Sequence, residues 1–342
     1  MSLSPSPISV SDDEETSVFN AADADIRLRS SDGVVFAVHR LLLRWISPFF
    51  ADMLSLPQPT DGDADKPMIE MSEDATSLRL LLCFSYPRTQ CPEPSLTTVT
   101  DIRRAATLAR KFDCGPLVRA VGHAIVQLAQ KHPEAAYALA WKFELRIALR
   151  ASARASVCRT WFIEDGRVVP EFNDLPAQSI ILLGRYRSAF YDAVLRELSI
   201  DELHPHPDWI AKADVESARE LRPIEPHSEH PGPCVCKICS CEKFMMGFRF
   251  SRNPEAFLFN QLLPYDTPRW WLNFVANVLA SIKASSIDAA ILKAARTARK
   301  EVRACPRCCP LLDFDDALIT TGVLLKEAIE RQLDKTPLHP PF

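Results

Sequence analysis

The stretch Ser30–Phe50, SSDGVVFAVHRLLLRWISPFF, combines the signals of a tight turn, a strand and two helix starts in one short run. Asp32-Gly33 predicts a hairpin, because glycine tolerates the positive φ that such turns need. The β-branched and aromatic residues that follow are typical of the returning strand. Ser47-Pro48 predicts a helix start, since serine caps helices well and proline fits the first helical position. This order of elements indicates a domain that mixes a small sheet with helices.

The residues on both sides extend the same pattern. Ile26 and Leu28 alternate with charged residues, which predicts a half-buried strand before the hairpin. Met68–Met71 alternates in the same way, and three amphipathic helical segments follow it before Leu128. We therefore expect an α+β fold over residues 22–128, with a small sheet capped by helices.

These residues resemble a BTB/POZ domain through the segments DADIRL, DGVVFAVHRLLLRWISPFFADML, IEM, LRLLLCFSYP and AATLARKFDCGPL. The resemblance implies protein–protein binding, because BTB domains typically form homodimers and many recruit cullin-3 ubiquitin ligases or transcriptional corepressors. The layout of the whole chain is similar to that of fungal, basidiomycete-type BTB-domain proteins. We expect a non-enzymatic, homodimeric adaptor for a cullin-3-type ubiquitin ligase. A nuclear regulator that assembles corepressors is the alternative.

The resemblance also implies where partners bind. Asp25 on the first strand and Arg40 after His39 match the two charged positions of the family's dimer groove, and Trp45 and Phe50 complete the candidate partner-binding set. A buried Asp–Arg pair is costly to desolvate and persists where it orders an interface. In the alternative, Asp25 only caps the strand and Arg40 extends to water. His39 is interpreted as structural, because no nucleophile or orienting acid is evident near it, and no catalytic residue is assigned.

The remaining residues divide into four further parts. Residues 1–21 are interpreted as a disordered acidic Ser/Pro tail, because they hold little apolar side-chain area to bury. Residues 129–221 are expected to form a helical extension, 222–233 a Pro/His-rich linker, and 234–335 a helical C-terminal domain that contains Cys pairs. The fold after the BTB-like part is thus expected to be mostly α-helical.

A basic stripe marks the extension. Lys142, Arg146, Arg150 and Arg154 recur at every fourth residue of one long helical segment, beside a stripe of apolar residues expected to be buried that includes Ile147. A solvated helix face is the favoured interpretation of these cations, and a docking face for an acidic partner is the alternative.

Composition narrows the class of partner. The net charge of −4 and pI near 6.1 give the whole chain no electrostatic pull towards nucleic acid or anionic membrane, so neither is expected as a partner. No apolar run approaches the roughly 20 residues that a membrane span needs. The N-terminus has neither a basic start nor an apolar core, so no secretory signal is expected. We expect a cytoplasmic or nuclear protein.

Two cysteine pairs predict a metal site. Cys236 with Cys239 and Cys305 with Cys308 are both C-x-x-C, the spacing that lets two thiolates of one turn bind one zinc ion. Helical segments between the pairs could fold back and bring them together as one structural zinc site. The cysteines could instead be free thiols, or Cys234, Cys241 and Cys309 could be ligands in another combination.

The zinc site predicts that the purified full-length protein contains about one zinc ion per chain. Replacing Cys305 and Cys308 by Ser should release it, because two of the four thiolates are lost. Elemental analysis by mass spectrometry measures the metal content, with Cys309→Ser as the matched control that keeps its zinc. A wild-type protein without metal would contradict the prediction.

Overall fold

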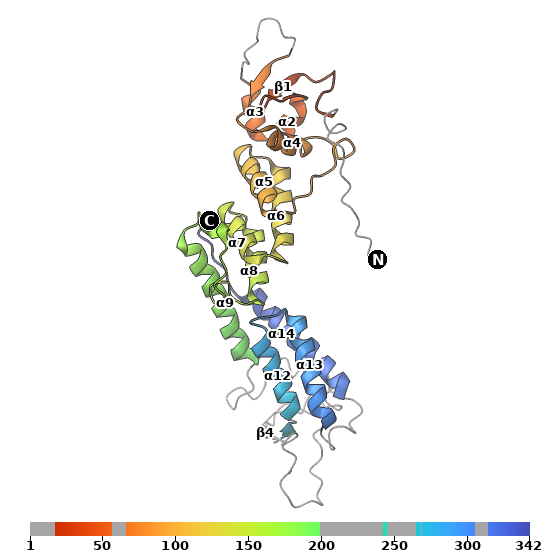
Figure 1. Ribbon diagram of the computed structural model, residues 1–342, viewed down its shortest axis with the longest axis vertical. Coiled ribbons are helices and arrows are strands. Elements are labelled where there is room, and N and C mark those ends of the chain that lie inside the picture. The colour runs from red at the N-terminus through yellow and green to blue at the C-terminus, as the bar shows by residue number, and fades with distance from the viewer. Residues whose placement is uncertain (1–17, 57–65, 199–241, 245–264, 268, 305–313) are drawn as a thin grey trace, which may run out of the picture. The chain divides into compact units, whose positions relative to one another are not determined.

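The computed structural model describes residues 18–56, 66–198, 242–244, 265–267, 269–304 and 314–342. The chain divides into two compact units, residues 1–152 with 170–175, and residues 153–169 with 176–342. The elements of the first unit are β1 (Ile26–Arg29), β2 (Val35–Val38), α2 (Arg40–Ile46), α3 (Pro48–Met53), β3 (Met68–Glu70), α4 (Ala75–Cys83), α5 (Val99–Lys111), α6 (Gly115–Ala129), α7 (Pro133–Lys142) and η1 (Pro170–Phe172), and α8 (Arg146–Val157) begins there (Figure 1).

The first unit contains one three-stranded sheet in the order β2-β1-β3. β1 pairs antiparallel with β2, and it pairs parallel with β3 so that Leu28 lies opposite Ile69. Gly33 in the connecting turn has a φ of 88°, the left-handed conformation that glycine adopts at little cost. The predicted hairpin is therefore confirmed.

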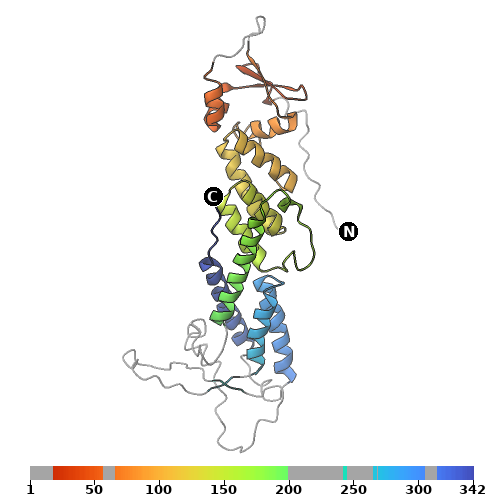
Figure 2. The same ribbon diagram turned by 90° about the vertical axis from the view of Figure 1, so that its left-hand side faces the viewer.

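One face of this sheet is covered by helices. Ile26 and Leu28 of β1 and their cross-strand neighbours Val38 and Phe36 of β2 are buried, whereas Arg29 on the other face is exposed. The helices that follow the strands supply the opposite wall of the core (Figures 1 and 2). Their fully buried side chains include Leu43, Phe50, Leu78, Leu81, Leu82, Ile102 and Leu117.

The domain begins earlier than the expected start at residue 22. Phe19 is 2% exposed, and its ring meets the rings of Phe36 and Tyr86 edge to face, with centroids 6.2 and 5.2 Å away. Its carbonyl accepts a 2.8 Å hydrogen bond from the N–H of Ala37 on the free edge of β2. Residues from 18 on thus belong to the packed domain, because this aromatic side chain fills its core.

The long helical segment expected after Pro133 is two helices. α7 ends at Lys142, and Glu144 in the turn has a φ of 58°, so the chain changes direction before α8 starts at Arg146. Ile147 is therefore 86% exposed, and the expectation that it is buried is wrong. The N–H of Leu145 bonds the carbonyl of Ala140 at 2.9 Å, which satisfies the backbone at this helix end.

The second unit is mostly helical. It contains α9 (Ala177–Leu198), a short ribbon of β4 (Glu242–Phe244) and β5 (Tyr265–Thr267), and the helices α12 (Arg269–Ser281), α13 (Ile287–Ala304) and α14 (Phe314–Lys335). α13 packs against both α12 and α14, and α9 packs against α14. Among the described residues, no helix combines the length and apolar content needed to cross a membrane.

A buried arginine fixes the end of α8 in this unit. Arg187 of α9 is 5% exposed and donates to the carbonyls of Ser156 and of Arg159, the latter at 2.7 Å. Its guanidinium also lies 4.9 Å from the ring centroid of Trp161, a cation–π distance. The Tyr191 hydroxyl donates to the carbonyl of Val157. Side chains of α9 thus satisfy carbonyls that the helix end leaves without intrahelical partners.

Ser47 joins two helices of the first unit. It is fully buried, its hydroxyl oxygen accepts the N–H of Phe50 at 3.2 Å, and it donates to the carbonyl of Phe112 after α5. The predicted capping role is confirmed, and the bond to Phe112 adds a tertiary contact.

Replacing Ser47 by Ala should lower the free energy of unfolding by about 2–4 kcal/mol. The loss of the cap accounts for about 1 kcal/mol, and the unsatisfied buried carbonyl accounts for about 1–3 kcal/mol. Urea denaturation followed by circular dichroism measures the change. Ser55→Ala removes an exposed hydroxyl at the end of the same helix and is the control, with an effect within about 0.5 kcal/mol. Equal changes in the free energy of unfolding for the two substitutions would contradict the proposed contribution of Ser47.

Candidate functional site

The solvent side of α2 carries two large apolar side chains. Leu41 and Trp45 lie one helical turn apart, and they are 56% and 76% exposed. Phe49, the second residue of α3, is 41% exposed. We call Leu41, Trp45 and Phe49 the α2 surface. Large exposed side chains of this kind, grouped on consecutive helices, are typical of contact with another polypeptide.

Trp45 was predicted from the sequence as a partner-binding residue, whereas Leu41 and Phe49 were missed. The segment RLLLRW contains three consecutive leucines and a tryptophan, so periodicity alone does not separate its buried side from its exposed side. The structure makes the separation, because Leu43 is fully buried.

Phe50 lies in the core and not on a partner surface. Its side chain is fully buried and stacks on Phe112 with 5.1 Å between ring centroids and 12° between planes. Helical spacing placed Phe49 and Phe50 in the same segment, but only Phe50 points inward. The assignment of Phe50 to the partner-binding set is corrected on this ground.

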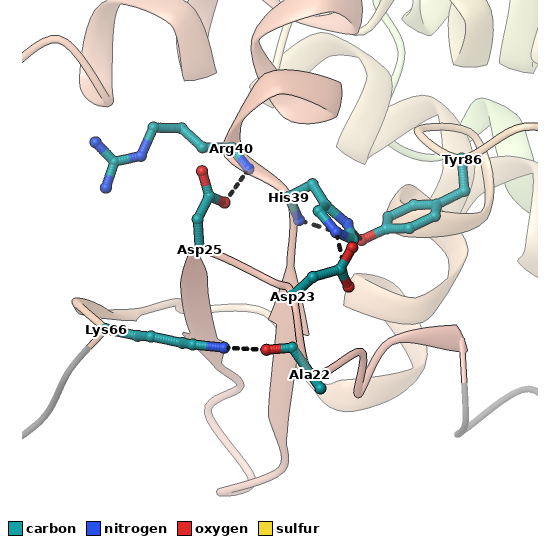
Figure 3. A network of polar contacts seen from close by, with 7 residues as sticks. All are labelled: Ala22, Asp23, Asp25, His39, Arg40, Lys66 and Tyr86. Atoms are coloured by element: carbon teal, nitrogen blue, oxygen red, sulfur yellow. Dashed lines mark hydrogen bonds and ion pairs between the residues drawn. The ribbon is translucent and has the colours of Figure 1, made fainter.

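Asp25 and Arg40 are neighbours, but their side chains do not form the expected buried ion pair. The exposed Asp25 carboxylate accepts the backbone N–H of Arg40 at 2.7 Å, and Figure 3 shows this bond at the start of α2. His39, the cap residue of α2, makes no side-chain capping bond, so Asp25 does this from the neighbouring strand. A carboxylate at a helix N-terminus is favourable because the helix dipole is positive there.

His39 joins this cap to the core. Its Nδ1 lies 3.0 Å from the hydroxyl of Tyr86, which also accepts the backbone N–H of His39 at 3.2 Å, and its Nε2 lies 3.4 Å from a carboxylate oxygen of Asp23 (Figure 3). A neutral imidazole with its proton on Nε2 satisfies both contacts, with Tyr86 donating to Nδ1. Burial raises the pKa of the Tyr86 phenol, so that it stays protonated as this donor requires.

The same contacts hold the N-terminal segment of the domain. Lys66 donates to the carbonyl of Ala22 at 2.7 Å, beside the Asp23–His39 contact (Figure 3). In the part of the chain that the structure describes, no Ser or Cys side chain bonds His39, which leaves it without a nucleophile to activate. The network therefore supports the α2 surface and has the composition of a structural element.

A second surface lies where α5 and α6 meet the turn between α7 and α8. An open groove of about 250 Å³ has an apolar lining that includes Ala106, Val118, Val121, Phe143 and Leu145. We call it the α5–α6 groove.

The rim of the α5–α6 groove is charged. Arg110 lies 3.6 Å from the Glu144 carboxylate, an exposed pair that contributes little to stability. Asp113 and Glu144 both line the groove, and among the described residues they are the two non-glycine residues with positive φ, at 45° and 58°. Asp113 directly follows the C-cap residue of α5, and Glu144 directly follows the C-cap residue of α7. Glycine is the usual residue at this position. The groove thus keeps two carboxylates at positions where the backbone favours glycine.

The predicted basic stripe does not form one face. The turn at Glu144 separates Lys142 from the other three cations, and Lys142 pairs with Asp174 at 3.1 Å. Arg154 forms an ion pair with Asp334. The stripe is therefore divided between two helices and partly neutralised.

The predicted zinc ligands Cys236, Cys239, Cys305 and Cys308 lie outside the described residues, so the zinc site stays a prediction. Within the described ranges, no cluster of three or more His, Cys, Asp or Glu side chains could hold a metal ion. Of the cysteines in those ranges, Cys83, Cys91 and Cys114 are buried.

Comparison with protein families identifies the first domain. Residues 18–128 match the model of the BTB/POZ domain, and they contain the sheet, the α2 surface and the His39 network. No curated protein matches the chain, so its similarity to fungal proteins stays a prediction. BTB domains are protein–protein interaction modules, and this part of the chain is one by its sequence match and by its small sheet with helices.

Proposed function

We propose that the BTB/POZ domain makes this protein a non-catalytic, dimeric adaptor that brings other polypeptides to a cullin-3-type ubiquitin ligase. The observation that carries the proposal is the family match over residues 18–128 together with two separate surfaces for protein contact, the α2 surface and the α5–α6 groove. An adaptor needs at least two such surfaces, because it must hold a second protomer and a ligase component at once.

The α2 surface is the proposed dimer contact. In a twofold dimer both protomers use the same surface, so each of its exposed side chains becomes buried once in each protomer. Burying one large apolar side chain contributes about 1.5–3 kcal/mol. Arg40 and Asp25 stay in the proposed dimer contact, although their side chains do not pair with each other. The Asp25 carboxylate accepts the Arg40 N–H at the start of α2, so both residues lie at the end of the helix that carries the α2 surface.

Trp45→Glu should convert a dimer into a monomer, because it places a charge in the centre of the apolar contact. Sedimentation velocity at micromolar concentration measures the change. Ile147→Glu is the matched control, since Ile147 is 86% exposed in the same unit but lies outside the α2 surface. A wild-type protein that sediments as a monomer, or a dimer that tolerates Trp45→Glu, would refute this contact.

The α5–α6 groove is the proposed ligase contact. Its volume of about 250 Å³ suits one or two large apolar side chains of a partner segment, and the carboxylates of Asp113 and Glu144 would favour a neighbouring Lys or Arg. α5 and α6 belong to the matched domain, while the α7–α8 turn belongs to the residues after it. Both parts are therefore needed to form the groove.

Val118→Arg should reduce binding to a purified cullin-3 homologue at least tenfold, because the new side chain occupies the groove beside Asp113. Val34→Arg is the control, since Val34 is 40% exposed and Val118 36% exposed, and it should leave binding unchanged. Biolayer interferometry with the full chain measures both. Wild-type protein that does not bind the cullin would refute the adaptor function, while the dimer would remain testable by sedimentation.

A further inference from the structure

The solvent face of α13 carries a row of cations that neither the domain match nor the proposed adaptor function uses. Lys293, Arg296, Lys300 and Arg303 are all exposed, and they recur at intervals of three and four residues. We call these four residues the α13 ridge. At about 100° per residue they fall within an arc of about 80°.

The opposite face of α13 is packed. Its buried residues are small or β-branched, namely Ala290, Ala294, Ala295, Ala298 and Val302. α14 approaches closely at Gly322, where a Cβ atom would lie only 2.8 Å from Cγ2 of Ile291. Lys326 of α14 binds Asp288 at 2.7 Å, and Asn273 of α12 binds Glu301 at 3.1 Å. The helix is thus fixed on its inner side, and the orientation of the ridge towards solvent follows from this packing.

The described part of the chain does not neutralise the ridge cations. Within the described ranges, none of the four forms an ion pair with an acidic side chain. The two acids of α13, Asp288 and Glu301, project outside the arc of the ridge and have the partners named above. Four like charges on one helix face repel one another and cost stability, unless an anion offsets them.

The spacing of the ridge matches a phosphate backbone. Lys293 and Arg303 are ten residues apart, which corresponds to about 15 Å along the helix axis. One strand of duplex DNA carries a phosphate every 3.4 Å along its axis, so that length faces about four phosphates. Lys and Arg are the side chains that bind phosphate best, through charge and through several N–H donors.

We propose that the α13 ridge binds the phosphate backbone of duplex DNA without reading its sequence. The side chains of the ridge are all cationic, and phosphate contacts of this kind set position and affinity but not base preference. The chain's net charge of −4 does not oppose this, because charges beyond about 10 Å are screened at moderate salt and the local charge decides. This proposal departs from the expectation of no nucleic-acid partner, which rested on net charge.

Fluorescence anisotropy of a labelled 20-base-pair DNA duplex tests the proposal with the full chain. Non-specific binding is expected with a Kd of about 10⁻⁶–10⁻⁴ M at physiological salt, and with a lower Kd at low salt. If four phosphates are neutralised, the logarithm of the binding constant should fall against the logarithm of salt concentration with a slope of about −3.6, a loss of about 10²-fold between 50 and 200 mM.

The variant carrying Lys293→Gln, Arg296→Gln, Lys300→Gln and Arg303→Gln should bind at least tenfold more weakly, with a slope nearer zero. The matched control replaces four exposed cations of the first unit by Gln and changes the net charge equally, namely Arg44, Arg119, Lys131 and Arg146. It should bind like wild type. Circular dichroism verifies that both variants are folded.

Three results would overturn the proposal. The first is wild-type protein that does not bind the duplex at low salt. The second is equal weakening by the ridge variant and by the charge-matched control, which would assign binding to net charge. The third is a polyglutamate peptide that competes as well as unlabelled duplex at equal charge concentration, which would make the ridge a contact for acidic polypeptides. None of these assays uses the α2 surface or the α5–α6 groove, so they leave the adaptor proposal to its own tests.

Discussion

Burial of a single face of a three-stranded sheet organises the BTB domain. Strands this short cannot hold together in water by their hydrogen bonds alone, and Ile26, Leu28, Phe36 and Val38 present one continuous apolar face. Helices supply the other side of the core. Leu43 of α2 is fully buried in it, so the opposite side of that helix faces solvent and carries the exposed Leu41 and Trp45.

Polar contacts then fix the position of that helix. Asp25 caps α2 from the adjacent strand, and His39 is held between Asp23 and Tyr86. These bonds connect residues that are far apart in sequence. They hold the segment before β1, the start of α2 and the residues after α4 in one hydrogen-bonded network. An interface that must accept a second polypeptide benefits from such a support, because less conformational entropy is lost when a rigid surface binds.

Local signals in the sequence predicted much of the fold. Gly33 in the turn and Ser47 as a cap act through their own backbone or their neighbours, and both roles are confirmed. The failures concern residues whose role depends on tertiary packing. The sequence around Glu144 gives no signal of a helix end, because the residue that adopts the left-handed conformation there is not glycine.

The candidate surfaces were harder to predict for the same reason. Phe49 and Phe50 are chemically identical and both rings contact Phe112, but tertiary packing buries Phe50 fully and leaves Phe49 41% exposed. The α13 ridge left a readable charge pattern in the sequence, but its meaning depends on which cations the fold neutralises. Arg154 forms an ion pair with Asp334, whereas Arg296 forms none with an acid of the described residues.

The two left-handed acids beside the α5–α6 groove have a consequence for how this protein can be improved. Glycine at residues 113 and 144 would relax the backbone, and a laboratory selection for heat resistance alone would favour that exchange. The same exchange would erase the charge on the rim of the groove. Under the proposed ligase contact, thermostability and recognition therefore compete at these two residues, and an engineer who seeks a more stable scaffold should leave both acids in place.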